Sequence, residues 1–200
     1  VSVLSAGIFY KDIENFIVLA ETSDLIDLEE LVGVPVDDAE VIQPINGDNA
    51  KLLGIELAAV KQFENGWFLS ANGTYVDSEA TYSGRAGKGV MPRTPEWVLN
   101  GAVGWENRAF SFRLAANYRD IALQGFEDLE DEDFDVFQDE FVQVDFSAKW
   151  NITQQWQLAF TATNLTDEPF YTYFGSKAYN AQFEEYGRTY SLGVRYTPFQ

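Results

Sequence analysis

The chain has 200 residues, a formal net charge of −19, and neither cysteine nor histidine. Such an acidic surface repels nucleic acid, and the missing residue types exclude disulfides, thiolate metal sites, and histidine-based triads or zinc sites within this chain. Aromatic residues make up 16% of the sequence, which favours β structure because flat rings pack well on a pleated surface. No apolar run of about 18 residues suggests a transmembrane helix, but membrane-spanning strands of about 10 residues escape that test.

The predicted elements are strands in which apolar and polar residues alternate. In chain order they cover residues 2–10, 15–22, 50–62, 67–82, 97–105, 110–119, 142–150, 155–164 and 189–198. Segment 15–22 is the exception, since residues 16–20 are apolar on both faces. Every other strand is expected to have one apolar and one polar face.

The connections between these strands alternate in length. Short ones are predicted at 11–14, 63–66, 106–108 and 151–154, and long ones, mostly acidic, at 23–47, 83–93, 121–139 and 166–187. Residues 25–32 in the first long connection are compatible with one or two turns of amphipathic helix. Strands that run up and down with all short turns at one end give this rhythm, which is typical of outer-membrane barrels. A soluble β-sandwich has no reason to sort its loops by length.

In a transmembrane barrel, the two faces of each strand separate lipid from the lumen. The residues expected to point outward are Phe112, Leu114, Tyr118, Val144, Phe146 and Leu192. The residues expected to point inward are Arg113, Asn117, Gln143, Asp145 and Lys149. Arg113 and Arg119 share one face of a single strand, which indicates that this face contacts water and not a packed core.

The tryptophans form the second part of this pattern. Trp67, Trp105, Trp150 and Trp156 lie beside the short turns, and Trp97 begins the strand that Trp105 ends. Indole rings are enriched where a membrane meets water. We therefore expect the first four at one membrane interface and Trp97 at the opposite interface.

Several short motifs resemble the C-terminal barrel of TonB-dependent outer-membrane receptors. They are Asn-Leu-Thr-Asp-Glu-Pro at 164–169, Glu-Glu-Tyr-Gly-Arg-Thr-Tyr at 184–190, the strand at 46–57 with its Ala-x-x-x-Gly-x-Glu core, and Pro-Arg-Thr-Pro at 92–95. In that family, an Asn-Leu-x-Asp segment closes the penultimate strand and a Gly-Arg-x-Tyr segment opens the last. Each motif is short, but their order and spacing make the resemblance fairly specific.

The resemblance implies an all-β, antiparallel, up-and-down transmembrane barrel. Residues 1–200 would supply about nine C-terminal strands of a barrel of about 22 strands with a plugged lumen. The plug domain and the TonB-binding segment would precede Val1, the first strand would pair with an upstream strand, and the last strand would pair with the first strand of the barrel. The expected location is the bacterial outer membrane, with lipid and lipopolysaccharide around the barrel.

The implied function is TonB-energised uptake of a scarce nutrient of the siderophore-iron, cobalamin or oligosaccharide class, without covalent chemistry or a cofactor. Arg113, Asn117 and Arg119 are candidates for contact with this ligand, although they also fit contacts with the plug domain or with water. Aromatic residues of the last long connection, Tyr173, Phe174 and Tyr179, either stack on the ligand or pack the loop against its neighbours. Paired acids such as Asp167 and Glu168 are interpreted as solvated loop charges, and no metal site is assigned.

Two other functions remain open from the sequence. A passive porin-type channel has the same strand pattern but no plug domain. A soluble carbohydrate-binding β-sandwich has similar strands but buries its apolar faces and tryptophans in a dry core. Calcium binding by the acidic connections also remains open, although their spacing does not match an EF-hand loop.

Overall fold

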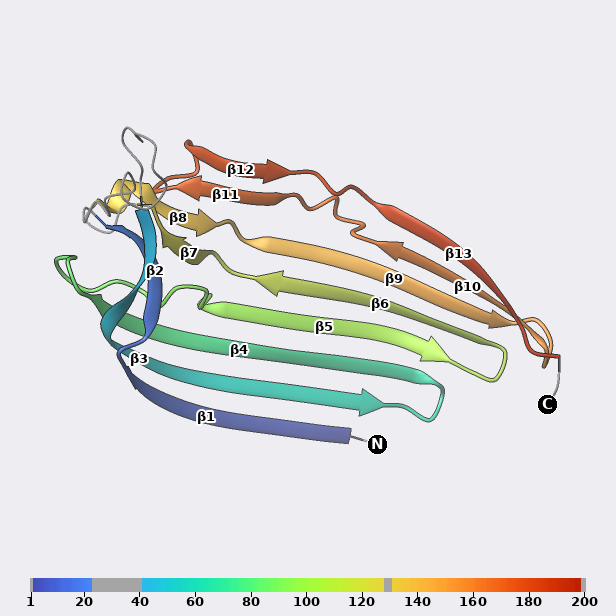
Figure 1. Ribbon diagram of the computed structural model, residues 1–200. Helices are drawn as coiled ribbons and strands as arrows, with labels where there is room; N and C mark the ends of the chain where they lie inside the picture. Colours follow the sequence, from blue (N-terminus) through green and yellow to red (C-terminus); the bar gives the residue numbers. More distant parts are fainter. Residues whose placement is uncertain (1, 23–40, 128–130, 199–200) are drawn as a thin grey trace.

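A computed structural model describes residues 2–22, 41–127 and 131–198. Its main feature is a curved, open antiparallel sheet of nine strands, with a four-stranded sheet at one end (Figure 1). No helix of the described residues is long and apolar enough to cross a membrane. The short connections 63–66, 107–109 and 152–155 lie together at what we name the turn end, and the long connections lie at the opposite cap end.

The main sheet follows the chain from one edge to the other, in the order β1-β3-β4-β5-β6-β9-β10-β13. The strands on this path are β1 (Ser2–Glu14), β3 (Val41–Gln62), β4 (Trp67–Tyr82), β5 (Trp97–Glu106), β6 (Phe110–Arg119), β9 (Phe141–Asn151), β10 (Trp156–Thr163) and β13 (Thr189–Tyr196). The ninth strand, β2 (Ile17–Thr22), pairs with β3. The predicted antiparallel up-and-down barrel architecture is confirmed, and the sheet of this chain alone is not closed.

The start of the chain differs from the prediction. Residues 11–14 are not a turn but the end of β1, and β2 continues in the same direction after a bend at Asn15, which has a φ of 55°. Asparagine tolerates this left-handed conformation, so the chain bends without reversing. Glu14 pairs with Asn49 and Ile17 pairs with Asn46, so β1 and β2 together line β3. Segment 15–22 is therefore not a separate crossing.

The smaller sheet replaces much of two predicted loops. It contains β7 (Ala122–Phe126), β8 (Asp135–Gln138), β11 (Phe170–Phe174) and β12 (Asn180–Glu184), in the order β12-β11-β8-β7, and a short 3-10 helix, η1 (Glu132–Phe134), precedes β8. These strands extend β6, β9, β10 and β13 beyond the main sheet (Figure 1). Residues 41–47 likewise belong to β3 rather than to a loop. The possible helical turn at 25–32 lies outside the described residues.

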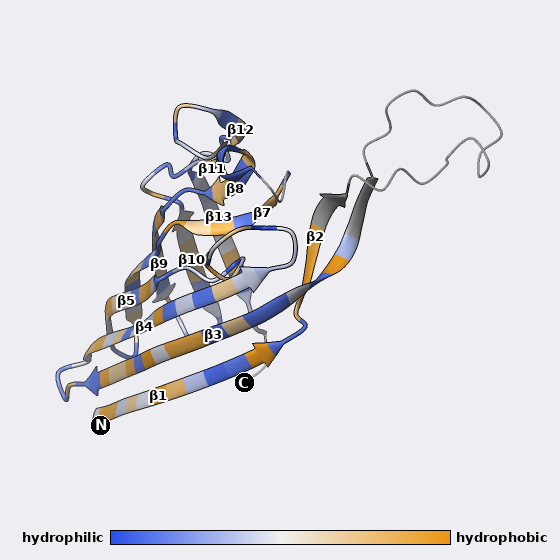
Figure 2. Cartoon of the chain, turned by 90° about the vertical axis from the view of Figure 1, so that its left-hand side faces the viewer, coloured by the Kyte–Doolittle hydropathy of each residue, from blue (hydrophilic) through white to orange (hydrophobic). Residues whose placement is uncertain are grey.

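The pairing register sorts the side chains into two faces, as predicted. On β6 and β9, Leu114 lies opposite Phe146, and Arg113 lies opposite Ser147. Residues in phase with Leu114 form the apolar face, and residues in phase with Arg113 form the polar face. The banding along β1, β3 and β4 is visible in Figure 2. Large side chains of the apolar face are exposed, with Leu4 at 82%, Ile8 at 78% and Leu192 at 73%, so the β-sandwich alternative is wrong.

Two glycines on the polar face are covered by phenylalanine rings from the neighbouring strand. Phe9 lies opposite Gly54, and Phe68 lies opposite Gly104. A Cβ atom at either glycine would overlap the ring, so these positions require the absence of a side chain. The aromatic ring supplies the packing that glycine lacks within a strand.

The cap end contains a hydrophobic cluster on the polar-face side, which we name the cap cluster. Its buried members are Phe16, Val18, Ala50, Leu52, Ala80, Tyr82, Leu123 and Phe126. The Tyr82 ring contacts Phe16 and Phe126 edge-on, with centroid distances of 5.5 and 4.8 Å. The cluster therefore joins β2, β3 and β4 to β7, and it holds the smaller sheet against the main one.

A buried ion pair closes the cap cluster. Arg85 donates two hydrogen bonds to Asp135, both 2.7 Å long, and each side chain is only 9% exposed. The guanidinium also lies over the Phe126 ring, 5.2 Å from its centroid. Hydrogen bonding to Asp135 raises the pKa of Arg85, so the guanidinium stays charged.

A charge on the apolar face should destabilise the barrel. Leu114→Arg is expected to cost roughly 2–4 kcal/mol if the residue lies near the membrane midplane, because the charge must leave water for hydrocarbon. Urea unfolding of the full receptor in lipid vesicles measures the change. Ala115→Arg is the matched control, since its side chain points to the polar face opposite Asp145. Equal losses for the two variants would contradict the assignment of faces.

Removing one member of the buried ion pair should loosen the cap. Arg85→Ala is expected to cost about 3–5 kcal/mol, because the Asp135 carboxylate then stays buried without a partner. Unfolding in denaturant, monitored by protease cleavage of the connections, measures this loss of stability. Lys88→Ala is the control, because Lys88 lies in the same connection as Arg85 but forms an exposed ion pair with Glu79. Its loss should change the free energy of unfolding little. An Arg85→Met, Asp135→Leu double variant should recover most of the stability, and its failure would indicate a different role for the pair.

Candidate functional site

The polar face carries a row of amide side chains that crosses four strands. Asn72, Asn100, Asn117 and Gln143 lie directly opposite one another on β4, β5, β6 and β9. Asn100 donates a 2.9 Å hydrogen bond to Asn72, and Gln143 donates to both carboxylate oxygens of Asp145. This amide row presents donors and acceptors at one level of the wall. The sequence predicted that Asn117 and Gln143 point inward, whereas their alignment with Asn72 and Asn100 is visible only in the register.

The two arginine candidates lie on the same strand but far apart. Arg113 is exposed and faces Gly104 and Ser147, whereas Arg119 ends the strand between Val98 and Phe141. Six residues separate them, which is about 20 Å along a strand. The structure therefore brings Asn117 into the amide row but does not gather all three candidates at one point.

Arg119 has an incompletely satisfied guanidinium. It lies over the Phe141 ring, 5.8 Å from its centroid, and its Nε atom is buried without a hydrogen-bond partner among the described residues. A buried donor without a partner costs free energy, so this position favours an additional acceptor. Arg119 is thus the arginine candidate whose surroundings best suit an anionic or carbonyl group.

A row of aromatic rings crosses the smaller sheet. Phe183, Tyr171, Tyr173 and Phe137 follow one another on β12, β11 and β8, with successive centroids 6.0, 5.8 and 5.8 Å apart. Tyr173 is only 5% exposed, and burial raises the pKa of its phenol. Phe137 packs against the cap cluster. Tyr173 is therefore packed against other rings of the cap, and its contact with a ligand stays a prediction.

The other aromatic candidates of this region are more accessible. Tyr179, in the connection between β11 and β12, is 68% exposed, and its carbonyl accepts a 2.9 Å hydrogen bond from the Phe174 amide. Phe174 is half-buried on the opposite face of β11 from Tyr173. The sequence thus grouped three residues with different surroundings, and Tyr179 is the one most open to a ligand.

The Asn164 motif forms the junction between the two sheets. Asn164 is buried with a φ of 58°, and its amide donates to the carbonyls of Glu168 and Gly187 at 3.1 and 3.2 Å. Its backbone N–H donates to Asp145 of β9, and Arg188 donates to the Leu165 carbonyl. The motif thus fixes the end of β10 and the start of β13 against β9, which is a structural rather than a ligand-binding role.

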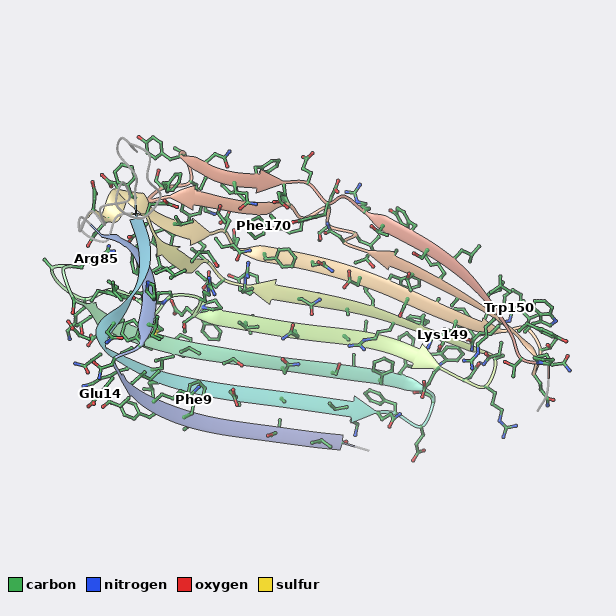
Figure 3. The ribbon with its side chains drawn as sticks, viewed as in Figure 1. Phe9, Glu14, Arg85, Lys149, Trp150 and Phe170 are labelled. Atoms are coloured by element: carbon green, nitrogen blue, oxygen red, sulfur yellow. The ribbon has the colours of Figure 1, made fainter. Side chains whose placement is uncertain are left out.

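The tryptophans lie at the strand ends, as the pattern predicted. Trp67 and Trp105 face each other across β4 and β5, and Trp156 contacts Tyr196 with centroids 4.5 Å apart. Trp150 lies with them at the turn end, opposite Arg85 at the cap end (Figure 3). The Trp105 indole donates to the Asn65 carbonyl of a turn at 2.9 Å, which orients its polar edge away from the sheet.

Trp97 lies at the far end of β5 and contacts Tyr75, with a centroid distance of 4.7 Å. Four of the tryptophans, Trp67, Trp97, Trp150 and Trp156, are exposed on the apolar face. This arrangement differs from the dry tryptophan core that a soluble sandwich requires. Whether these rings mark membrane interfaces stays a prediction.

The carboxylates of the cap serve mainly as partners for neighbouring groups. Asp135 holds Arg85, Asp139 pairs with Lys177 at 2.6 Å, and Asp131 accepts a hydrogen bond from the Asp133 amide. In the part of the chain that the structure describes, no group of three or more acidic residues is arranged to hold a metal ion. The candidate surface for ligand contact consists of amides, arginine and aromatic rings, and its role in binding stays a prediction.

Comparisons with known proteins agree with this architecture. The family model described as TonB dependent receptor-like, beta-barrel, matches residues 2–165. A search of curated proteins found no match. Solved structures with the same fold include the siderophore receptor PiuA from Acinetobacter baumannii, with a TM-score of 0.64 and 21% identity over 98% of this chain and 26% of that one.

Two further structures are similar. The copper transporter OprC has a TM-score of 0.66 and 16% identity, covering 98% of this chain and 29% of its own. The ferric-catecholate import receptor Fiu from Escherichia coli K12 has a TM-score of 0.64 and 17% identity, covering 98% and 25%. The chain thus spans between a quarter and a third of the length of these proteins, and identities this low establish the fold alone. Because the family model covers most of the chain, this protein belongs to the TonB-dependent receptor β-barrel family.

Proposed function

We propose that residues 1–200 form the C-terminal part of an outer-membrane receptor that imports a scarce nutrient with energy delivered through TonB. The observation that carries this proposal is that the main sheet, which matches the family, has an apolar face on one side and a polar face on the other. An apolar face of this size is stable only against lipid, and a polar wall requires a lumen containing water or protein. A plug domain of the same protein is the proposed occupant of that lumen.

The open edges of the sheet support a larger barrel. β1 and β13 are the first and last strands of the order, and β13 pairs only with β10 among the described strands. Unpaired backbone groups in hydrocarbon cost several kcal/mol each, so strands outside this chain are expected to cover both edges. We propose that β1 pairs with an upstream strand and β13 pairs with the first strand of the barrel.

The proposed ligand is a small nutrient of the siderophore-iron, cobalamin or oligosaccharide class. The amide row and Arg119 offer hydrogen bonds from the lumen wall, and the exposed Tyr179 offers a ring at the cap. Exposed carboxylates of the cap, such as Glu127 and Asp131, disfavour strongly anionic ligands because like charges repel at short range. The proposed ligand therefore binds mainly through rings and uncharged polar groups, and not through net negative charge.

Energy-dependent uptake tests this function directly. A bacterium that carries the full-length receptor is given labelled ferric siderophores, cobalamin and oligosaccharides, with and without a functional TonB. One of these ligands should accumulate only when both proteins are present. Uptake that persists without TonB would support the passive channel instead.

Accessibility to protease tests the orientation. In intact cells, protease is expected to cut the exposed segment around Glu127 and 131–134 at the cap end and to spare the turn at 152–155. Cells with permeabilised outer membranes serve as the control, because the turn then becomes accessible as well. Cleavage of intact cells at the turn alone would show that the cap end faces the periplasm.

Tyr179→Ala should weaken ligand binding without disturbing the fold. We expect a loss of roughly 0.5–1.5 kcal/mol, or about twofold to twelvefold in Kd, if its ring stacks on the ligand. Isothermal titration with the ligand identified by uptake measures this change. Tyr186→Ala is the matched control, since Tyr186 is also 68% exposed but lies near the β12–β13 junction. Equal affinities for Tyr179→Ala and the unmodified receptor would exclude Tyr179 from the site.

A further inference from the structure

The aromatic row of the smaller sheet and the amide row of the main sheet lie on the same side of the chain. Phe137, at one end of the aromatic row, packs against the cap cluster, which is on the polar-face side. Tyr173 is opposite Phe137 in the register, and Tyr171, opposite Phe183, contacts the Tyr173 ring. The aromatic row is therefore the continuation of the polar face beyond the main sheet (Figure 1).

Access to the aromatic row changes along its length. Phe183, on the edge strand β12 of the smaller sheet, is 53% exposed, whereas Tyr173 is buried. Tyr171 lies between these two rings, is half-buried, and contacts Phe183 edge-on. The rings of Phe183 and Tyr171 are therefore the accessible part of the row.

The amide row has hydrogen-bonding groups to spare. Asn100 donates one hydrogen bond to Asn72, but the side chain of Asn117 has no hydrogen-bond partner among the described residues. The next positions of this face toward the turn end carry short side chains, at Ser70, Ala102 and Ala115. An amide both donates and accepts, as a hydroxyl group does, whereas a carboxylate only accepts. The row therefore suits hydroxyl groups.

The two rows are far apart along the chain. Six residues separate Phe137 of the aromatic row from Gln143 of the amide row, which is about 20 Å in an extended chain. Between them, the Arg119 guanidinium lies over the Phe141 ring, and its Nε atom lacks an acceptor among the described residues. From the cap toward the turn end, this side thus presents rings, an unpaired donor and amides, in that order.

We propose that the ligand is a neutral, linear oligosaccharide that extends from the smaller sheet to the amide row. The proposal rests on the nutrient uptake proposed above and selects one of its three ligand classes. The C–H groups of a sugar ring are slightly positive and pack against the negative face of an aromatic ring, here Phe183 or Tyr171. Sugar hydroxyl groups both donate to and accept from the amides, and one hydroxyl oxygen supplies the acceptor that Arg119 lacks.

The other two ligand classes fit this surface less well. The donor atoms of a ferric siderophore surround one iron ion, and the corrin ring of cobalamin surrounds one cobalt ion, so both ligands are compact. A compact ligand contacts one row at a time, whereas an extended chain contacts both. A ferric catecholate also carries net negative charge, which the exposed carboxylates of the cap disfavour. Length and neutrality therefore distinguish the oligosaccharide from its competitors.

The dependence of affinity on ligand length tests this proposal. The full-length receptor is titrated calorimetrically with neutral oligosaccharides that differ in sugar, linkage and length, from disaccharide to hexasaccharide. A ferric catecholate, a ferric hydroxamate and cobalamin are titrated in parallel. We expect one oligosaccharide series to bind, with an affinity that rises with length as the second row is reached.

Two variants shorten one row each. Phe183→Ala and Asn117→Ala should each weaken hexasaccharide binding about fivefold, which is the value of one ring contact or one hydrogen bond. Phe134→Ala and Gln157→Ala are the matched controls and should leave the affinity unchanged. Phe134 is an exposed ring of the cap outside the row, and Gln157 is an amide on the same face near the turn end. Asn117→Gln keeps the amide and should retain most of the affinity, which separates recognition from a folding defect.

Several outcomes would overturn the proposal. They are equal affinities for disaccharide and hexasaccharide, equal losses in the variants and their controls, and a failure of every oligosaccharide to bind. If only a ferric chelate or cobalamin binds and its uptake requires TonB, the oligosaccharide is wrong and the proposed uptake function stands. If an oligosaccharide binds through both rows but enters cells without TonB, the ligand class is right and the proposed energy coupling is wrong.

Discussion

The hydrogen-bond register between neighbouring strands is the constraint on which the rest of this structure depends. Side chains alternate along a strand, so a slip of one residue would exchange the apolar and polar faces of that strand. Across the main sheet, the register keeps Leu114 beside Phe146 and Arg113 beside Ser147. The amide row and the facing tryptophans are both products of this alignment, because each combines residues that are adjacent only across strands.

Sequence reasoning predicted the faces well because alternation is a local property of each strand. It failed at the first bend, where residues 16–20 are apolar on both faces. The structure gives the reason: Phe16 and Val18 are buried in the cap cluster, and Ile17 and Leu19 are exposed on the other side. A bend and a turn require similar residues locally, and only pairing with the long strand β3 distinguishes them.

The cap was predicted least well, because its strands are short and depend on distant partners. β8 and β11 pair through Phe137 and Tyr173, which are separated by β9 and β10 in the sequence. The acidic composition of the connections indicated carboxylates in water. Asp135 is an exception, because it is buried in an ion pair with Arg85 that holds two of these connections together. For the candidate site, the sequence identified Asn117 but could not place it in a row, and it grouped the buried Tyr173 with the exposed Tyr179.

The phenylalanine–glycine pairs restrict how this protein can change over generations. Gly54 lies beneath the Phe9 ring, and Gly104 lies beneath Phe68, so each pair shares one fixed volume across two strands. A larger residue at Gly54 is tolerated only after Phe9 has become smaller, and the effects of the two changes are therefore not additive. At Gly104 a Cβ atom would also lie 2.5 Å from the Phe112 carbonyl oxygen, so a smaller residue at position 68 does not free that position. Lineages that exchange these volumes must pass through an intermediate with a gap or a clash. Related sequences should consequently keep or replace Gly54 and Phe9 together, and should keep Gly104.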